Sequence, residues 1–282
     1  MPELPEIQAV VEGLDRAVSG RTVVAARAVH PALVKSAAPG LAEITGGLTS
    51  SVWRRGKLSG LSAGSSVLGI PLRQAGRLSR APSPQPRLPR AVALTLDLDD
   101  GRQFRVREAA TEHRASAYVV PSDERESLPL IARLGPEPVG LRPEVWRERL
   151  STPPGLLHTA IRQGRRVAGI GRAYASDIMW AARLAPFART STMTDEEYAR
   201  LATAADTVLT QALERARRDI DTDLPNREGR VTLVHGQAGS PCVRCGRTLE
   251  RVSFEGYELV YCPTCQTDGT VYADRRMSRL LR

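Results

Sequence analysis

The stretch CVRCGRTLERVSFEGYELVYCPTC, residues 242–265, holds all four cysteines of the 282-residue chain. They form two C-x2-C pairs, Cys242 with Cys245 and Cys262 with Cys265, separated by sixteen residues. This spacing is typical of a zinc ribbon, in which four thiolates hold one structural Zn²⁺ in a closed tetrahedral site. Two disulfides are the alternative interpretation, which a chain expected in the reducing cytoplasm does not favour.

Between the cysteine pairs, TLERVSF and YELVY alternate in polarity around Glu255-Gly256, which predicts a β-hairpin. A ribbon of this size buries little apolar surface, so we expect bound zinc to hold it folded. The ribbon by itself indicates no catalytic role.

The region before the ribbon is predicted to be helical. Four segments have helical patterns with Pro and Gly between them: 143–150, 156–163, 172–184 and 195–220. In VAGIGRAYASD (167–177), two glycines precede the third helix, where backbone N–H groups could approach an anion. Arg165, Arg166 and Arg172 add positive charge that suits a DNA phosphate. A simple glycine turn between helices is the alternative.

The N-terminal region is predicted to be β-rich behind a leading helix. Apolar residues recur at helical spacing from Leu4 to Val18, with Pro5 at the helix start and Gly20 at its end. Strand patterns follow at 22–25, 48–53, 66–70, 91–98 and 117–120. The Pro- and Arg-rich segment 80–90 is predicted to be a loop. We therefore predict a β-rich domain with a leading helix at 1–126, a linker at 127–141, a helical domain at 142–225, and a zinc-finger domain with a basic tail at 226–282.

The charge balance favours a polyanionic partner. The formal net charge is +9 and the pI is near 10.0, which suggests nucleic acid rather than a membrane, although high pI alone could serve solubility. No apolar run approaches a membrane span, and the N-terminus lacks a signal-peptide layout, so we expect a cytoplasmic protein. Only Lys35 and Lys57 are lysines, so Lys57 is a candidate for a role that needs a compact ammonium group.

Six motifs occur in order: MPELPE (1–6), RRGK (54–57), AGRL (75–78), LGPEP (134–138), AGIGRAYASD (168–177), and the ribbon with CQ at 265–266. Together they resemble the formamidopyrimidine-DNA glycosylase and endonuclease VIII family of base-excision repair enzymes. The resemblance implies an α+β multidomain fold: a leading helix with a β-sandwich, a helix–two-turn–helix domain and a C-terminal zinc finger. It also implies one structural zinc ion and double-stranded DNA with a damaged base or abasic site as partner. We expect a monomer that is associated with the nucleoid and not with a membrane.

The resemblance also assigns a role to the unusual start of the chain. In this family Met1 is removed, and the secondary amine of Pro2 attacks the sugar C1′, expels the damaged base and forms an iminium that permits strand cleavage by elimination. An α-amino group suits this role because it titrates near neutrality. Glu3 would donate a proton to the opening sugar ring, and Glu6 would support the site. The alternatives are a proline that merely flanks the helix for Pro2 and complementation of the helix dipole for Glu3 and Glu6.

The remaining site residues follow from the same resemblance. Lys57 would lie near the lesion and its phosphate, with Arg54 and Arg55 on the DNA backbone. The chain departs from the family where Gln74 replaces a wedge methionine, Arg172 an asparagine and Tyr257 a finger arginine. The segment at 108–113 also lacks the family's void-filling residues, which glycosylases need once a base is flipped out.

These departures leave two matters open. Gln74, Arg73, His113 or Arg114 could fill the void, and the lesion could be an oxidised purine, an oxidised pyrimidine or a bulky alkylated or cross-linked base. The sequence therefore supports a bifunctional glycosylase and abasic-site lyase, with a non-catalytic DNA-lesion binder on the same scaffold as the alternative.

Overall fold

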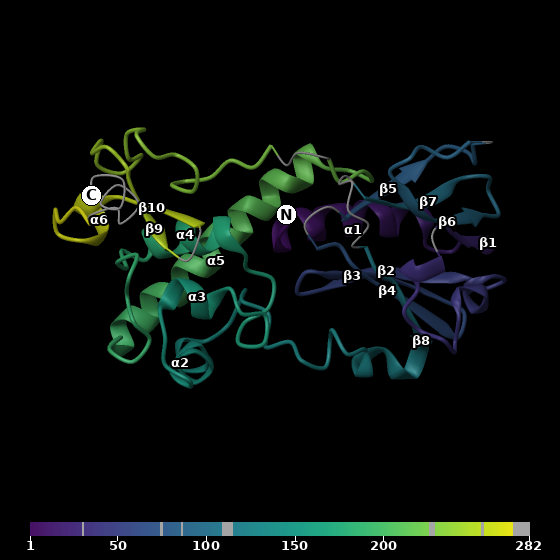
Figure 1. The fold of residues 1–282 in the computed structure, drawn as a ribbon, viewed down its shortest axis with the longest axis horizontal. Helices are drawn as coiled ribbons and strands as arrows, with labels where there is room; N and C mark the ends of the chain where they lie inside the picture. The colour runs from purple at the N-terminus through teal and green to yellow at the C-terminus, as the bar shows by residue number, and fades with distance from the viewer. Residues whose placement is uncertain are drawn as a thin grey trace, which may run out of the picture. The chain divides into compact units, whose positions relative to one another are not determined.

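The computed structural model describes residues 1–29, 31–73, 76–85, 87–108, 115–225, 229–254 and 257–272. The chain forms two compact units, Met1–Leu134 with Leu213–Gly229, and Gly135–Ala212 with Arg230–Arg282 (Figure 1). Among the described residues, no helix combines the length and apolar character that crossing a bilayer requires.

The first unit is a β-sandwich with a leading helix, α1 (Leu4–Val18). One four-stranded antiparallel sheet has the order β1-β6-β7-β5, and the other has the order β2-β3-β4-β8. The strands are β1 (Val23–Ala28), β2 (Thr49–Arg55), β3 (Leu58–Ala63), β4 (Ser66–Pro71), β5 (Gly76–Ala81), β6 (Val92–Leu98), β7 (Gln103–Glu108) and β8 (Tyr118–Pro121). Short 3-10 turns occupy Pro31–Leu33, Leu41–Ile44 and Ser122–Ser127.

One hydrophobic core joins the two sheets to α1. Ile7 and Leu14 of the helix pack with Leu61 of one sheet and with Leu96 and Phe104 of the other, and all five are at most 1% exposed. The apolar spacing along α1 therefore lies on the face that the sandwich buries. At the far end of α1, Asp15 Oδ1 accepts a hydrogen bond from the N–H of Val52 at 2.6 Å, which fixes the helix to β2.

Three strands of the sandwich were not predicted. β3 has the sequence LSGLSA, whose Gly and Ser residues have low strand propensity, so the strand was not predicted. Glycine is required at position 60, because a Cβ there would lie 2.2 Å from the Trp53 ring. β5, GRLSRA, has similar small and polar residues. β7, QFRVRE, does alternate in polarity, and the Asp100-Gly101 turn leads into it, so its pattern was readable.

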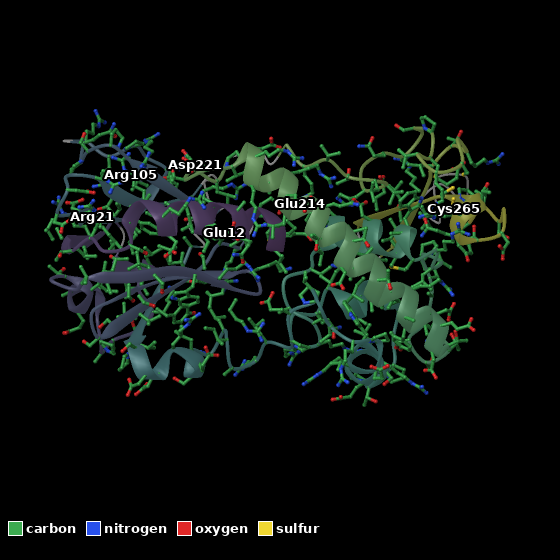
Figure 2. All side chains as sticks on the ribbon, turned by 180° about the vertical axis from the view of Figure 1, so that it is seen from behind. Glu12, Arg21, Arg105, Glu214, Asp221 and Cys265 are labelled. Atoms are coloured by element: carbon green, nitrogen blue, oxygen red, sulfur yellow. The ribbon has the colours of Figure 1, made fainter. Side chains whose placement is uncertain are left out.

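The last turns of α5 (Asp195–Asp219) belong to the first unit. Arg217 donates two hydrogen bonds to the carboxylate of Glu12, each 2.8 Å long, and Figure 2 marks Glu12 on α1. The Arg217 guanidinium holds the pKa of Glu12 below its usual value. A Cβ on Gly13 would lie 2.0 Å from the Asp221 carbonyl oxygen, so only glycine allows this close approach.

The second unit contains the four predicted helices and the ribbon. The helices are α2 (Pro143–Ser151), α3 (Leu157–Ile161), α4 (Arg172–Ala181) and α5, of which residues up to Ala212 lie here. The ribbon contains β9 (Glu250–Phe254), β10 (Tyr257–Tyr261) and the short α6 (Pro263–Gln266). β9 and β10 pair antiparallel, which confirms the predicted hairpin, although its turn at 255–256 lies outside the described residues.

The loop predicted at 80–90 is confirmed for residues 82–85 and 87–90, which form no helix or strand, but residues 80 and 81 end strand β5, so its predicted start was wrong. The division of α5 between the two units is a property of packing and not of sequence pattern. The domain boundaries read from the sequence stay predictions.

Candidate active site and metal centre

The N-terminal turn of α1 buries the residues that the sequence marked as catalytic. Pro2 is buried, and Glu3 and Glu6 are only 3% and 4% exposed. Glu3 is the N-cap residue and forms a capping box with Glu6, whose Oε2 accepts the Glu3 N–H at 2.8 Å. This capping interaction was not predicted from the sequence, and it also fixes the backbone that follows Pro2.

The turn that carries Lys57 is fixed against the same helix. Gly56 and Lys57 join β2 to β3, and Gly56 has φ +59°, a conformation that favours glycine. Arg54 donates from Nε to Gln8 Oε1 at 2.8 Å and from Nη1 to the Gly56 carbonyl at 2.9 Å. Because Gln8 lies in the N-terminal half of α1, this bridge holds the Lys57 turn near that end of the helix. Lys57 and Arg55 are half-buried.

The three arginines around the glycine turn differ in their surroundings. Arg165 and Arg172 are exposed, and Arg172 is the first residue of α4. Arg166 is 9% exposed and donates to Gln163 Oε1 at 2.9 Å and to the carbonyls of Leu150 and Pro153 at 2.7 and 2.6 Å. Its guanidinium therefore holds the turn together from inside.

The LGPEP motif packs against this turn. Gly135 donates its N–H to the Gly164 carbonyl at 2.8 Å, and the Ala168 N–H donates to the Pro136 carbonyl at 2.9 Å. A Cβ on Gly135 would lie 2.2 Å from the Arg166 carbonyl oxygen. The glycine is thus required by backbone contact, and the motif supports the shape of the turn.

Most of the candidate void-filling residues lie outside the residues that the structure describes. Gln74, His113 and Arg114 lie outside the described residues, and Tyr257 begins β10. Arg73 is exposed and has φ +47°, an uncommon conformation for a residue with a Cβ. Which residue would fill a void stays open.

Two buried ionisable residues were missed by sequence reasoning. Asp177 of α4 is 1% exposed and accepts hydrogen bonds from the N–H groups of residues 233–235 at 2.8, 3.0 and 3.1 Å. Burial raises the pKa of Asp177, while these three N–H groups lower it. Asp177 is an acidic residue on an otherwise apolar face of α4, and this pattern could have indicated a buried contact. The contact joins α4 to the segment that leads to the ribbon.

His158 of α3 is the second such residue. Burial lowers the pKa of His158 to about 3, and the Arg162 guanidinium, 3.2 Å from Nδ1, acts in the same direction. Its Nε2 lies 3.5 Å from Ser176 Oγ of α4. His158 is therefore a neutral packing residue between α3 and α4 at physiological pH.

The four cysteines converge on one point. Their sulfur atoms all lie within 4.8 Å of one another, with Sγ–Sγ distances of 4.0 Å for Cys242–Cys265, 3.5 Å for Cys245–Cys262 and 3.6 Å for Cys245–Cys265. A tetrahedral ion with Zn–S bonds of about 2.3 Å places its sulfur ligands about 3.8 Å apart. The four thiols therefore fit zinc.

The protonation of the thiols agrees with a cation site. Burial raises the pKa of Cys262 to about 12 and also raises that of Cys265. Burial opposes ionisation of Cys242 as well, but the N–H groups of Arg244 and Cys245 lower the pKa of Cys242 to about 6. Four adjacent thiolates need a cation to exist together, and bound zinc supplies that charge.

Three family models match the chain in order. The model "Formamidopyrimidine-DNA glycosylase N-terminal domain" matches residues 1–111, "Formamidopyrimidine-DNA glycosylase H2TH domain" matches 134–223, and "Zinc finger found in FPG and IleRS" matches 239–267. A formamidopyrimidine-DNA glycosylase of Geobacter sulfurreducens is 31% identical over 277 residues, which cover 94% of this chain and 100% of the relative. The chain belongs to the formamidopyrimidine-DNA glycosylase family.

Further similarities support this family and its fold. A formamidopyrimidine-DNA glycosylase of Parafrankia sp. is 31% identical over 288 residues, covering 94% of this chain and 98% of the relative. The Lactococcus lactis Fpg, solved in complex with DNA that contains an abasic site, superimposes with a TM-score of 0.83 at 23% identity, over 94% of this chain and 99% of the other. The predicted α+β fold with a helix–two-turn–helix domain and a C-terminal zinc finger is confirmed.

The zinc finger of this family member holds one structural zinc ion through Cys242, Cys245, Cys262 and Cys265. Gln266, the second residue of the CQ motif, accepts the Cys262 N–H at 2.9 Å and donates to the Leu184 carbonyl at 2.7 Å. It therefore connects a zinc ligand to the segment after α4.

Replacing a ligand is expected to unfold the zinc finger alone. Cys262→Ser should release zinc, and the fluorescence of Trp180 should shift to the red, because this side chain is 6% exposed and packs against Leu249 and Val260 of the ribbon. Metal analysis should give one zinc per wild-type chain. Val243→Ala, at a site 72% exposed between two ligands, should change neither result. Freshly purified wild-type protein without stoichiometric zinc would contradict the assignment.

Proposed function

We propose that the protein is a bifunctional DNA glycosylase and abasic-site lyase that excises a damaged base from double-stranded DNA through a Schiff base on Pro2. The observation that supports this most is the buried Pro2–Glu3 segment, fixed by Glu6 at the start of α1 in a member of this family. Glutamate side chains are almost never this deeply buried unless they are paired, and Glu3 and Glu6 are only 3% and 4% exposed.

The proposed chemistry begins once Met1 has been removed, since Pro2 then has a secondary amine. This amine attacks the sugar C1′, the bond to the damaged base breaks, and an iminium forms. The iminium makes the C2′ proton acidic, so the 3′ phosphate leaves by β-elimination.

Glu3 is proposed as the acid that protonates the opening sugar ring. Its place between Pro2 and the first helical residue puts its carboxyl next to the nucleophile along the chain. Glu6 is proposed as a positioning residue, because its contact is with the Glu3 backbone. Lys57 is proposed to contact the lesion phosphate, with Arg54 fixing its turn and Arg55 beside it.

DNA binding is proposed to involve the glycine turn and the zinc finger. Arg165 and Arg172 are exposed at the start of α4, where helix N-termini suit phosphates. The DNA in the Lactococcus lactis Fpg complex supports the same class of partner. Gln74 and Tyr257 are retained as proposed DNA contacts from the sequence, whereas the internal bonds of Arg166 favour a structural role. We propose that the protein acts as a monomer at the nucleoid, where its substrate lies.

Salt dependence tests the DNA contacts. Arg165→Ala and Arg172→Ala should each lower the slope of log affinity against log salt concentration by about one unit, because each removes a phosphate contact. Arg166→Ala should instead lower the free energy of unfolding by about 2 kcal/mol or more, since it leaves buried carbonyls unpaired. Fluorescence anisotropy with an abasic-site duplex and denaturant unfolding measure the two effects. An unchanged slope in both exposed variants would remove the turn from the DNA surface.

The enzymatic proposal is tested by borohydride reduction of the protein with an abasic-site duplex. A covalent protein–DNA adduct is expected. Tight binding without an adduct would instead favour the non-catalytic lesion binder, which the departures at positions 74, 172 and 257 motivate. Duplexes that carry an oxidised purine, an oxidised pyrimidine or a bulky alkylated base would then identify the lesion by the rate of base release.

A further inference from the structure

Three arginines surround a groove at the C-terminal end of α4. The groove has a volume of about 580 Å³, and Arg183, Arg200 and Arg244 line it. Its apolar lining includes Trp180, Val208 and Leu233. None of its described lining residues is acidic. The groove therefore combines an apolar floor with a concentrated positive rim, inside the second compact unit.

Two of these arginines are held by helix carbonyls. Arg244 lies over the Trp180 ring at 4.0 Å and donates to the carbonyls of Trp180 and Ala181 at 3.2 and 3.3 Å. Arg200 donates to the Ala182 carbonyl at 3.1 Å and lies 3.7 Å from Glu197. Both residues therefore already complement the negative end of α4.

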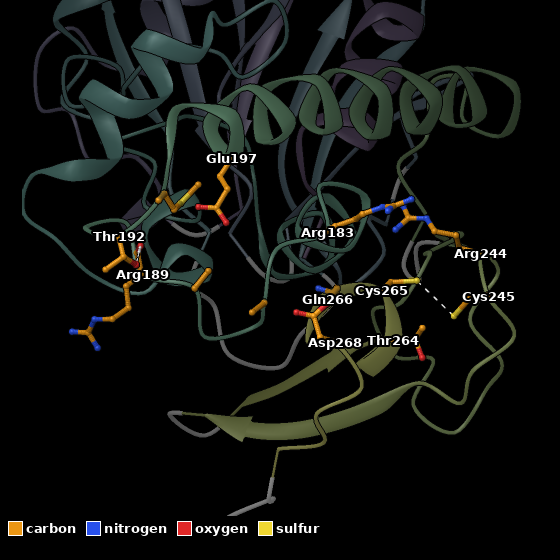
Figure 3. A pocket seen from close by; sticks show the side chains of 13 residues that line it. Arg183, Arg189, Thr192, Glu197, Arg244, Cys245, Thr264, Cys265, Gln266 and Asp268 are labelled. Carbon is orange, nitrogen blue, oxygen red and sulfur yellow. Dashed lines mark hydrogen bonds between the residues drawn. The ribbon is translucent and has the colours of Figure 1, made fainter.

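Arg183, the third arginine of the groove, does not donate to the helix carbonyls as Arg200 and Arg244 do. It is exposed, and its side chain has no hydrogen bond or ion pair with any described residue. Figure 3, which draws the neighbouring pocket that Arg183 and Arg244 also line, shows the Arg183 side chain pointing toward that of Arg244. Two guanidinium groups so arranged repel each other and attract an anion between them.

The backbone of Arg183 strengthens this argument. Its φ is +56°, the left-handed conformation that follows many helices and that glycine adopts with less strain. A residue selected for stability at this position would be glycine. The Arg183 side chain has no partner among the described residues, which indicates that it binds another molecule.

The neighbouring face of α5 offers room for a peptide segment. Ala199, Thr203, Thr207 and Gln211 follow one another at intervals of four residues and line the groove. The hydroxyl groups of Thr203 and Thr207 donate to the carbonyls of Ala199 and Thr203 at 3.1 and 2.9 Å. This leaves an exposed, uncharged surface about 18 Å long, which matches three turns of a helix.

We propose that this groove binds an acidic, amphipathic helical segment of a partner protein. Trp180 and Val208 are buried beneath the groove, so the apolar side chains of the segment would cover the half-buried Leu233 and the exposed Ala199. Its carboxylates would pair with Arg183 and with the remaining donors of Arg244. A DNA backbone suits the groove less well, because it offers no apolar surface for the floor. The groove also lies at the opposite end of α4 from Arg172, about 15 Å away along the helix. A partner could therefore bind together with DNA.

The test uses the full-length zinc-bound protein and a fluorescein-labelled 18-residue helical peptide of Glu and Leu at amphipathic spacing. Wild-type protein is expected to bind it in a salt-sensitive manner, and Arg183→Glu should weaken binding at least ten-fold. Arg149→Glu, an exposed site on α2 outside the groove, should change affinity less than two-fold. No binding by wild type, equal effects of the two variants, or equal binding of a peptide with Gln in place of Glu would overturn the proposal.

Arg183→Gly separates docking from a structural role. It should weaken peptide binding as Arg183→Glu does, while the melting temperature stays the same or rises, because glycine relieves the strained backbone. A melting temperature lowered by several degrees would overturn the proposal in favour of a structural arginine. Abasic-site DNA should bind both variants with unchanged affinity and should not displace the peptide. Competition between the two would assign the groove to DNA instead.

Discussion

Blocking the Pro2 nitrogen is expected to abolish covalent trapping on abasic-site DNA and strand cleavage there. A variant with one residue that cannot be removed ahead of Pro2 converts the amine into an amide, whose lone pair is delocalised and cannot attack C1′. DNA affinity should stay the same, because the proposed phosphate contacts at Arg165 and Arg172 lie elsewhere. Borohydride trapping and gel analysis of strand cleavage measure the loss, and fluorescence anisotropy measures binding.

The matched control has the same extension followed by a protease site that leaves Pro2 as the first residue after cleavage. Cleavage should restore trapping to the level of the processed wild type. Pro2→Gly is a weaker test, because a primary amine can still form a Schiff base. If the blocked protein traps and cuts as well as the free one, Pro2 is not the nucleophile, and Lys57 becomes the next candidate.

Glu3→Gln is expected to slow the release of a damaged base by about 10²–10⁴-fold, the usual effect of losing a general acid. The same variant should still form the Schiff base on a pre-formed abasic site, because the amine of Pro2 is unchanged. The amide keeps the size of the side chain and an acceptor oxygen for the helix cap, so folding should survive. Single-turnover base release and trapping, measured side by side, separate the two steps.

Glu6→Gln provides the comparison for Glu3→Gln. Its amide oxygen can still accept the Glu3 N–H, so we expect a much smaller effect on base release. Equal losses in the two variants would indicate that Glu3 acts only through the local structure. Base release by Glu3→Gln at the wild-type rate would remove it from the mechanism.

The local patterns were the most readable part of this sequence. The C-x2-C spacing identified the zinc ribbon because four ligands of one ion need a fixed geometry, and the apolar periodicity identified α1 and the four later helices. The MPELPE start pointed to the site before any contact was known. β3 and β5 were not readable, because their small and polar residues become strands only through pairing with neighbouring strands, β2 and β4 for β3 and β7 for the edge strand β5.

The sequence by itself determined helices α1 to α5, five of the eight described sandwich strands and the ribbon hairpin, which family the chain resembles and which residues bind zinc, since these depend on spacing within short segments. Only the tertiary structure decided how each charged residue is used. Arg165, Arg166 and Arg172 look alike in sequence, but Arg166 is buried and donates to carbonyls 13 and 16 residues away. Asp177 accepts hydrogen bonds from N–H groups 56–58 residues away. The groove beside Arg183 likewise combines α4, α5 and the zinc finger. A buried charge takes its role from the acceptors and donors that folding brings to it, and no local pattern contains that information.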